Sequence, residues 1–161
     1  MITSFLINTY YINQLICKED VLKLITLGNK YILDYPDEKE ARQGLDMLAK
    51  QLRSLPMNSG NYGLIHYDFQ LDNVFYKKEH RSFQVIDFDD AMYHWYACDV
   101  VTALDDFLNE PIDLNRSEVQ AFLNGYRAIA TLSDQAIRQF SCFKDSLSCI
   151  SFLNYYERSK V

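Results

Sequence analysis

Apolar residues recur at helical spacing in the first third of this chain. Between residues 41 and 55 they follow one another at alternating steps of four and three, which gives a helix one continuous apolar face (Ala41, Leu45, Leu48, Leu52, Leu55). Glu19 to Leu33 shows the same period less regularly, because Gly28 weakens it. Tyr35-Pro36-Asp37 separates the two segments, and Pro56 follows the second. The pattern therefore predicts two helices.

In the middle of the chain the helical spacing gives way to short apolar stretches. The turn-forming residues Asn58 to Asn61 precede Leu64-Ile65, which we expect to be a short buried stretch. The β-rich stretches Asn73 to Tyr76 and Phe83 to Ile86 lie on either side of Lys77 to Ser82. Two such stretches separated by a short polar connection predict a β-hairpin.

The remainder of the chain is predicted to be mainly helical. Met92 to Tyr96 is expected to be a loop, followed by a helix from Asp99 to Leu108 and a linker from Pro111 to Asn115. A second helix should run from a capping box at Ser117 through Tyr126. Ser133-Asp134 should start a last helical segment that continues to about Tyr156.

Composition limits the class of protein. The 161 residues are 48% apolar and 14% aromatic, without an internal repeat, which suits a single α+β, mostly helical domain over residues 1–161. The net charge of −6 argues against a general binder of nucleic acid or of anionic membranes. No uncharged apolar run approaches the ~20 residues that cross a bilayer, and no signal peptide is recognisable. We expect a cytoplasmic protein whose four cysteines are free thiols.

One polar motif lies among the predicted strands. Residues 66–73 read H-x-D-x-x-x-x-N, and Asp87 follows fourteen residues later after an apolar stretch. Phosphoryl transfer from a nucleotide needs a carboxylate at the acceptor hydroxyl and oxygen ligands that hold magnesium against the phosphates. Asp68 suits the first task, and Asn73 and Asp87 suit the second. Asp87 follows a strand and precedes Phe88, where a charge without a ligand or partner would be costly.

With these residues the chain resembles the C-terminal lobe of the aminoglycoside phosphotransferase and choline kinase family. The resemblance is clearest from Gly63 to Asp106. It implies a protein-kinase-like fold with a small β-hairpin next to the catalytic loop, a phosphotransferase that uses ATP and Mg²⁺, and a small-molecule acceptor. By this resemblance Asp68 is the catalytic aspartate, and Asn73 and Asp87 are the metal ligands.

The resemblance also implies supporting roles for two further residues. His66 would brace the catalytic loop, and Asp99 would hydrogen-bond the backbone of that loop from a helix. Tyr67 departs from the family pattern, because its position is often glycine. A bulky residue there would reshape the loop without removing a ligand.

Several other acidic residues have more than one interpretation. Asp89 and Asp90 would bind metal, attract a cationic substrate, or cap the next helix. Asp105, Asp106 and Glu110 form either a solvated face or a group that attracts an amine-bearing acceptor. The sequence leaves these alternatives open.

Two aromatic residues and two histidines complete the candidates. Tyr93 and Trp95 either pack in the interior or line an acceptor pocket through contact of a ring face with a cation. His80 and His94 have no partners at metal-ligand spacing, so neither is assigned to zinc.

The chain lacks the sequence signals of the N-terminal lobe of a kinase-like enzyme. None of its five glycines forms a G-x-G pair, and no strand-borne lysine of the V-A-I-K type is recognisable. We therefore expect a C-terminal lobe alone. Its function is either small-molecule phosphotransfer, with the missing half supplied elsewhere, or binding of a partner or of a second copy as an inactive lobe. A kinase acting on protein Ser or Thr is a third alternative.

Overall fold

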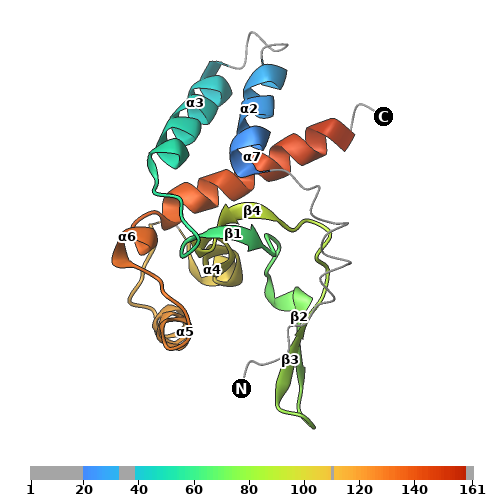
Figure 1. The fold of residues 1–161 in the computed structure, drawn as a ribbon, viewed down its shortest axis with the longest axis vertical. Coiled ribbons are helices and arrows are strands. Elements are labelled where there is room, and N and C mark those ends of the chain that lie inside the picture. The colour runs from blue at the N-terminus through green and yellow to red at the C-terminus, as the bar shows by residue number, and fades with distance from the viewer. Residues whose placement is uncertain (1–19, 33–38, 110, 159–161) are drawn as a thin grey trace.

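The computed structural model describes residues 20–32, 39–109 and 111–158, which form a helical body from which one hairpin projects (Figure 1). The elements are α2 (Val21–Tyr31), α3 (Lys39–Ser54), β1 (Tyr62–Ile65), η2 (Leu71–Asn73), β2 (Val74–Lys77), β3 (Ser82–Val85), β4 (Met92–Trp95), α4 (Ala97–Ala103), η3 (Asp105–Phe107), α5 (Ser117–Arg127), α6 (Asp134–Ile137) and α7 (Phe140–Arg158). The predicted fold class, α+β and mostly helical, is confirmed.

The apolar stripe of α3 is buried as its spacing predicts. Leu45, Leu48 and Leu52 lie in the core, whereas Ala41 at the start of the helix is exposed. The helix packs against α2 and α7, which close the upper part of the body (Figure 1). It ends at Ser54, just before Pro56. The α2 helix ends at Tyr31, before the predicted end at Leu33, and a 3₁₀ turn follows at Ile32.

The predicted loop from Met92 to Tyr96 is wrong, since most of it is the strand β4. This strand pairs antiparallel with β1, and the register places Trp95 opposite Tyr62 and Met92 opposite Ile65. Three of its four residues are buried, so both faces of β4 are covered and the alternation that marks a strand in sequence is absent. Leu64, predicted as buried, is 37% exposed.

The β-hairpin is confirmed. Strands β2 and β3 pair antiparallel, with Val74 opposite Val85 and Lys77 opposite Ser82. The hairpin extends away from the helices (Figure 1), and within the described part of the chain its main contacts are between its own strands and with η2. Large apolar side chains are consequently exposed on it, among them Phe75 at 52% and Phe83 at 66%.

The helices of the second half differ from the prediction at their ends. The segment predicted from Asp99 to Leu108 begins two residues earlier and breaks after Ala103 into η3. The α5 helix has Arg116 as its N-cap without a side-chain hydrogen bond, so the predicted capping box at Ser117 is wrong. Ser133 does cap a helix, since its Oγ accepts a hydrogen bond from the Ala136 amide, but this helix is the short α6. The long α7 starts separately.

A buried histidine joins β4 to α7. The Nδ1 atom of His94 accepts a hydrogen bond from the Trp95 amide at 2.8 Å, so Nε2 carries the proton and donates to Ser146 Oγ at 3.2 Å. The Ser146 hydroxyl in turn donates to the Phe143 carbonyl at 2.6 Å. His94 and Ser146 are fully buried. Burial lowers the pKa of His94 to about 3, and the imidazole is therefore neutral in the folded protein.

Within the described residues no helix is both long and apolar enough to cross a membrane. Cys98, Cys142 and Cys149 are free thiols, as predicted, and Cys17 lies outside the described residues.

The low pKa of His94 predicts loss of stability in mild acid. The unfolded chain binds a proton near the ordinary histidine pKa of about 6.5, whereas the folded protein resists it, so the free energy of unfolding falls as pH drops. We expect His94 to contribute a slope of up to about 1.4 kcal/mol per pH unit between roughly pH 6 and pH 4. Urea unfolding at several pH values measures it.

His94→Gln should flatten this slope, whatever its effect on stability at neutral pH. The matched control is His80→Gln, because His80 is exposed in the hairpin turn and should leave the slope as in the unaltered protein. Equal slopes in His94→Gln and the unaltered protein would contradict the assignment.

Candidate active site

The motif at residues 66–73 follows directly from β1, and the α4 helix holds its first two residues. One oxygen of the Asp99 carboxylate accepts a hydrogen bond from the His66 amide at 2.9 Å, and the other accepts one from the Tyr67 amide at 2.8 Å. The Thr102 hydroxyl, one turn further along α4, lies 2.9 Å from the Cys98 carbonyl and 3.2 Å from the Tyr67 carbonyl, so its one proton is shared between the two acceptors. The contact that the family resemblance implies for Asp99 is therefore present in the structure.

Asp99 makes these bonds from a largely buried position. Burial raises the pKa of its carboxyl above the ordinary aspartate value, and the hydrogen bonds from the His66 and Tyr67 amides oppose that shift. The charged form of the Asp99 carboxyl is thus disfavoured by burial and is stabilised by the two amide donors. The loop and the helix fix each other.

Tyr67 adopts the backbone conformation that explains why glycine would suit its position. Its φ is 73°, in the left-handed region that side chains other than glycine rarely occupy. The tyrosine ring is buried, and its hydroxyl donates to the Leu147 carbonyl at 3.3 Å. Burial raises the pKa of the phenol, which keeps the hydroxyl protonated. Packing of the ring against α7 offsets the backbone strain.

Asp68 and Asn73 lie in direct contact. The Asn73 Nδ2 atom donates to both the backbone carbonyl and the Oδ2 carboxylate oxygen of Asp68, each at 2.9 Å. Since Nδ2 is occupied in this way, Oδ1 is the Asn73 atom left to bind a cation. The second carboxylate oxygen of Asp68 makes no hydrogen bond to the described residues.

The segment that carries Asp87 is attached to the same loop. His66 Nε2 donates to the Ile86 carbonyl at 2.7 Å, because a carbonyl can only accept, and the His66 ring lies 4.4 Å from that of Phe88. The Ile86 amide donates to the Asn73 carbonyl at 3.1 Å. The residues on both sides of Asp87 thus contact the motif.

Asp87 itself differs from its sequence-based expectation in one respect. Its side chain is exposed, so the argument that an unpartnered charge would be costly at this position is wrong. Its φ of 61° is again in the left-handed region, where aspartate is better tolerated than most residues. An exposed carboxylate held in a strained turn is available to a ligand from solvent.

The other acidic residues are distributed around this centre. Asp89 and Asp90 are exposed. Asp105 forms an ion pair with Lys144 at 3.2 Å, and Glu110 lies outside the described residues. A cavity of about 310 Å³ lies beside the motif; its lining comprises Gln70, Leu71, Asp72, Thr102, Ala103, Asp105 and Asp106.

The two aromatic candidates lie on β4. Trp95 is 3% exposed, meets the rings of Tyr62 and Phe143, and lies at the far end of the β1–β4 sheet. Tyr93 is half-buried, and its carbonyl lies 3.2 Å from the Tyr62 hydroxyl, which has the Asp20 carboxylate as a nearer acceptor at 2.7 Å. The contacts of Trp95 support the packing interpretation for that residue.

The side-chain oxygens of Asn73 and Asp87 fit a small divalent cation whose remaining ligands are water and phosphate oxygens. The described part of the chain contains no group of three or more His, Cys, Asp or Glu side chains arranged to hold a metal ion. Asn73 could supply an amide oxygen and Asp87 a carboxylate oxygen. Mg²⁺ is usually bound by one or two such protein ligands together with water and phosphate oxygens.

Sequence reasoning missed one residue of the site. Thr102 contacts the motif, and it follows Asp99 by three residues in the same helix. Residues with this spacing share a helix face, so the predicted position of Asp99 was a usable signal for Thr102.

Comparison with known proteins gives the family of this chain. A model of the phosphotransferase enzyme family matches residues 25–133, which include the motif, Asp87 and Asp99. The chain belongs to the phosphotransferase enzyme family. This confirms the resemblance that the motif suggested.

Relatives within the phosphotransferase enzyme family include small-molecule kinases. The chain is 34% identical over 95 residues to amicoumacin kinase of Bacillus subtilis (strain 168), an alignment that covers 59% of this chain and 26% of that protein. It is similar to the structure of amicoumacin kinase hAmiN in complex with AMP-PNP, Ca²⁺ and Ami, with a TM-score of 0.63, 26% identity and coverage of 87% of this chain and 42% of the other. It shares its fold with a microcompartment-associated aminopropanol kinase, at a TM-score of 0.50, 24% identity and coverage of 71% and 41% of the two chains. The chain therefore spans less than half the length of the relatives it matches.

The contacts of Asp99 predict a large effect of its removal. Asp99→Ala leaves two buried amides without an acceptor, each of which costs about 1–3 kcal/mol, so we expect a loss of at least about 2 kcal/mol in the free energy of unfolding. Hydrogen exchange at the His66 and Tyr67 amides should accelerate more than exchange elsewhere.

Asp46→Ala is the matched control, because Asp46 is exposed on α3 and lies away from the motif. It should change stability by less than about 0.5 kcal/mol. Unchanged protection of the two amides in Asp99→Ala would refute the role given to this carboxylate.

Proposed function

We propose that this chain carries the catalytic centre of an ATP- and Mg²⁺-dependent phosphotransferase that acts on a hydroxyl group of a small molecule. The observation that carries this proposal is the contact of Asp68 with Asn73 in a loop whose backbone Asp99 holds. Membership of the phosphotransferase enzyme family supports it, as does the relative whose structure contains AMP-PNP and Ca²⁺.

Each residue has a separate task in the proposed reaction. The free oxygen of Asp68 accepts a hydrogen bond from the acceptor hydroxyl and takes its proton as the new P–O bond forms and the bond to ADP breaks. Asn73 Oδ1 and the Asp87 carboxylate would hold Mg²⁺. The metal supplies positive charge to the phosphate oxygens during transfer. Asp99 and His66 fix the loop and do not meet the reacting atoms.

The surroundings of the loop favour a cationic acceptor. The adjacent cavity is lined by Asp72, Asp105 and Asp106, and Lys144 is paired with only one of these carboxylates. A site with this excess of negative charge attracts amine-bearing molecules and raises their local concentration. We propose that the acceptor is a small hydroxyl compound with an amino group.

We further propose that the chain forms a single C-terminal lobe and that a nucleotide-covering lobe comes from elsewhere. The exposed apolar side chains of the hairpin support this, since a two-stranded hairpin is marginally stable in water without packing. The same surface supports a second candidate function. In that case the lobe binds a partner or a second copy through the hairpin without catalysing transfer.

Replacing the proposed base tests the first function. In the intact enzyme that contains this chain, Asp68→Asn keeps an oxygen for Asn73 but cannot take a proton. We expect the rate of phosphoryl transfer to an amino alcohol such as aminopropanol to fall by about 10²–10⁴-fold. Asp46→Asn, on the exposed side of α3, is the matched control and should keep kcat within about threefold. Full activity of Asp68→Asn would exclude Asp68 as the base.

Nucleotide binding separates the two candidate functions. In the intact protein that contains this chain, a working site should raise the Tm when ATP and MgCl₂ are added together by more than either does alone, because a ligand stabilises the state that binds it. Asn73→Ala and Asp87→Ala should abolish the joint effect, whereas Asp46→Ala should preserve it. Equal Tm with and without magnesium-ATP would favour the non-catalytic lobe.

A further inference from the structure

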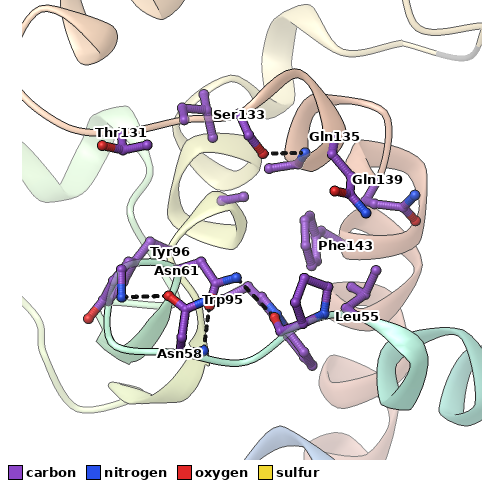
Figure 2. Close-up of a pocket in the computed structure, with 15 residues that line it drawn as sticks. Leu55, Asn58, Asn61, Trp95, Tyr96, Thr131, Ser133, Gln135, Gln139 and Phe143 are labelled. Atoms are coloured by element: carbon purple, nitrogen blue, oxygen red, sulfur yellow. Dashed lines mark hydrogen bonds between the residues drawn. The ribbon is translucent and has the colours of Figure 1, made fainter.

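A second pocket lies at the opposite end of the β1–β4 sheet from the motif (Figure 2). Its volume is about 310 Å³, and it is bounded by the α3–β1 loop, the start of α4, the α5–α6 loop and the first turn of α7. Trp95 pairs with Tyr62 at this end, while Ile65, at the other end, leads into the motif. Three strand steps of about 3.4 Å separate the two ends by roughly 10 Å. No residue assigned to the catalytic centre lines the pocket.

The lining of this pocket carries no charge. None of its fifteen residues is Asp, Glu, Lys, Arg or His, although 24% of the chain is charged. The interior wall is apolar, with Trp95, Phe143 and Leu132 buried there. The polar side chains are amides and hydroxyls, and Thr131 and Gln135 are exposed at the rim. A charged ligand would lose its hydration without gaining a counter-charge, so the pocket selects neutral molecules.

Hydrogen bonds hold the pocket open in a fixed shape. Trp95 Nε1 donates to the Pro56 carbonyl at 2.9 Å, and the Asn61 side chain donates to the same carbonyl and accepts from the Asn58 amide, each at 2.9 Å. On the opposite wall the Ser133 hydroxyl is occupied by the Ala136 amide at 3.1 Å. Figure 2 shows these contacts around the cavity. Both walls are therefore fixed by contacts within the protein, and preformed walls are typical of small-molecule sites.

We propose that this pocket is a second binding site, for a small uncharged molecule with an apolar ring and a hydroxyl or amide group. The ring occupies the space beside Trp95 and Phe143. The polar group faces Thr131 and Gln135 at the rim. The site is independent of the proposed phosphotransferase centre, because binding here uses none of its residues.

Trp95 provides the measurement, because it is the one tryptophan in the sequence and it lines the pocket. The probes are phenylpropanol, phenylpropylamine as its cation and phenylpropanoate, which share a ring and differ in charge. We expect phenylpropanol to change the tryptophan emission saturably, and the two charged probes to bind at least about tenfold more weakly, which corresponds to about 1.4 kcal/mol.

A pocket-filling variant locates the binding. Ala136→Phe adds a ring at the wall of the cavity and should weaken phenylpropanol at least about tenfold. Ala121→Phe makes the same change on the exposed side of α5 and should bind as the unaltered protein does. If circular dichroism shows that Ala136→Phe does not fold, the rim variant Gln135→Ala replaces it. This variant should lower the affinity for phenylpropanol and leave the fold intact.

Two results would overturn the proposal. One is the absence of a saturable emission change with phenylpropanol. The other is equal affinity of the neutral and charged probes, or of the pocket variant and Ala121→Phe, which would indicate non-specific partition onto the protein. Loss of magnesium-ATP binding in a separate experiment leaves this proposal unaffected.

Discussion

The two hydrogen bonds from the His66 and Tyr67 amides to Asp99 are the interaction on which the site depends. They place the motif against α4, a helix whose buried residues belong to the core. Burying the carboxylate is unfavourable, as its raised pKa indicates, so this contact is retained at a cost in solvation. The contact with Asp99 fixes the position of the loop. Asp68 follows the anchored residues directly, and its side chain is set by a backbone that has little freedom left.

A second buried polar contact fixes the strand from which α4 starts. His94 links β4 to α7 through Ser146, and β4 pairs with the strand that leads into the motif. The anchoring of Asp99 therefore rests on α7 as well as on α4, and the Tyr67 hydroxyl makes a further bond to α7 at Leu147. The loop thus contacts α4 through Asp99 and α7 through Tyr67, while His94 holds the strand that pairs with β1. A change in α7 should disturb the motif although no α7 residue is proposed to contact the reacting atoms.

The sequence was sufficient where local patterns carried the information. The spacing of Leu45, Leu48 and Leu52 predicted α3, and the polar connection Lys77–Ser82 predicted the hairpin. Local patterns failed at β4, because a strand buried on both faces shows no alternation of apolar and polar residues. They also failed at Ser117, because the N-cap of α5 is Arg116 although the sequence from Ser117 is typical of a capping box. The motif at residues 66–73, together with Asp87, indicated phosphoryl transfer. The exposure of Asp87 depends on tertiary contacts that no spacing of residues specifies, whereas the three-residue spacing from Asp99 was a usable signal for Thr102.

The proposed centre has two halves that differ in how firmly they are held. Asp68 belongs to a loop tied to the core by Asp99, Thr102 and Tyr67, whereas Asp87 lies on an exposed turn connected through Ile86 and Phe88. That turn follows a hairpin with unpacked apolar side chains, so its position depends on the contacts of His66 and Asn73 with Ile86. A ligand that joins Asn73 to Asp87 would stabilise the less anchored half most. In the proposed centre the fold would therefore set the position of the base, and a bound ligand would complete the half that holds the metal.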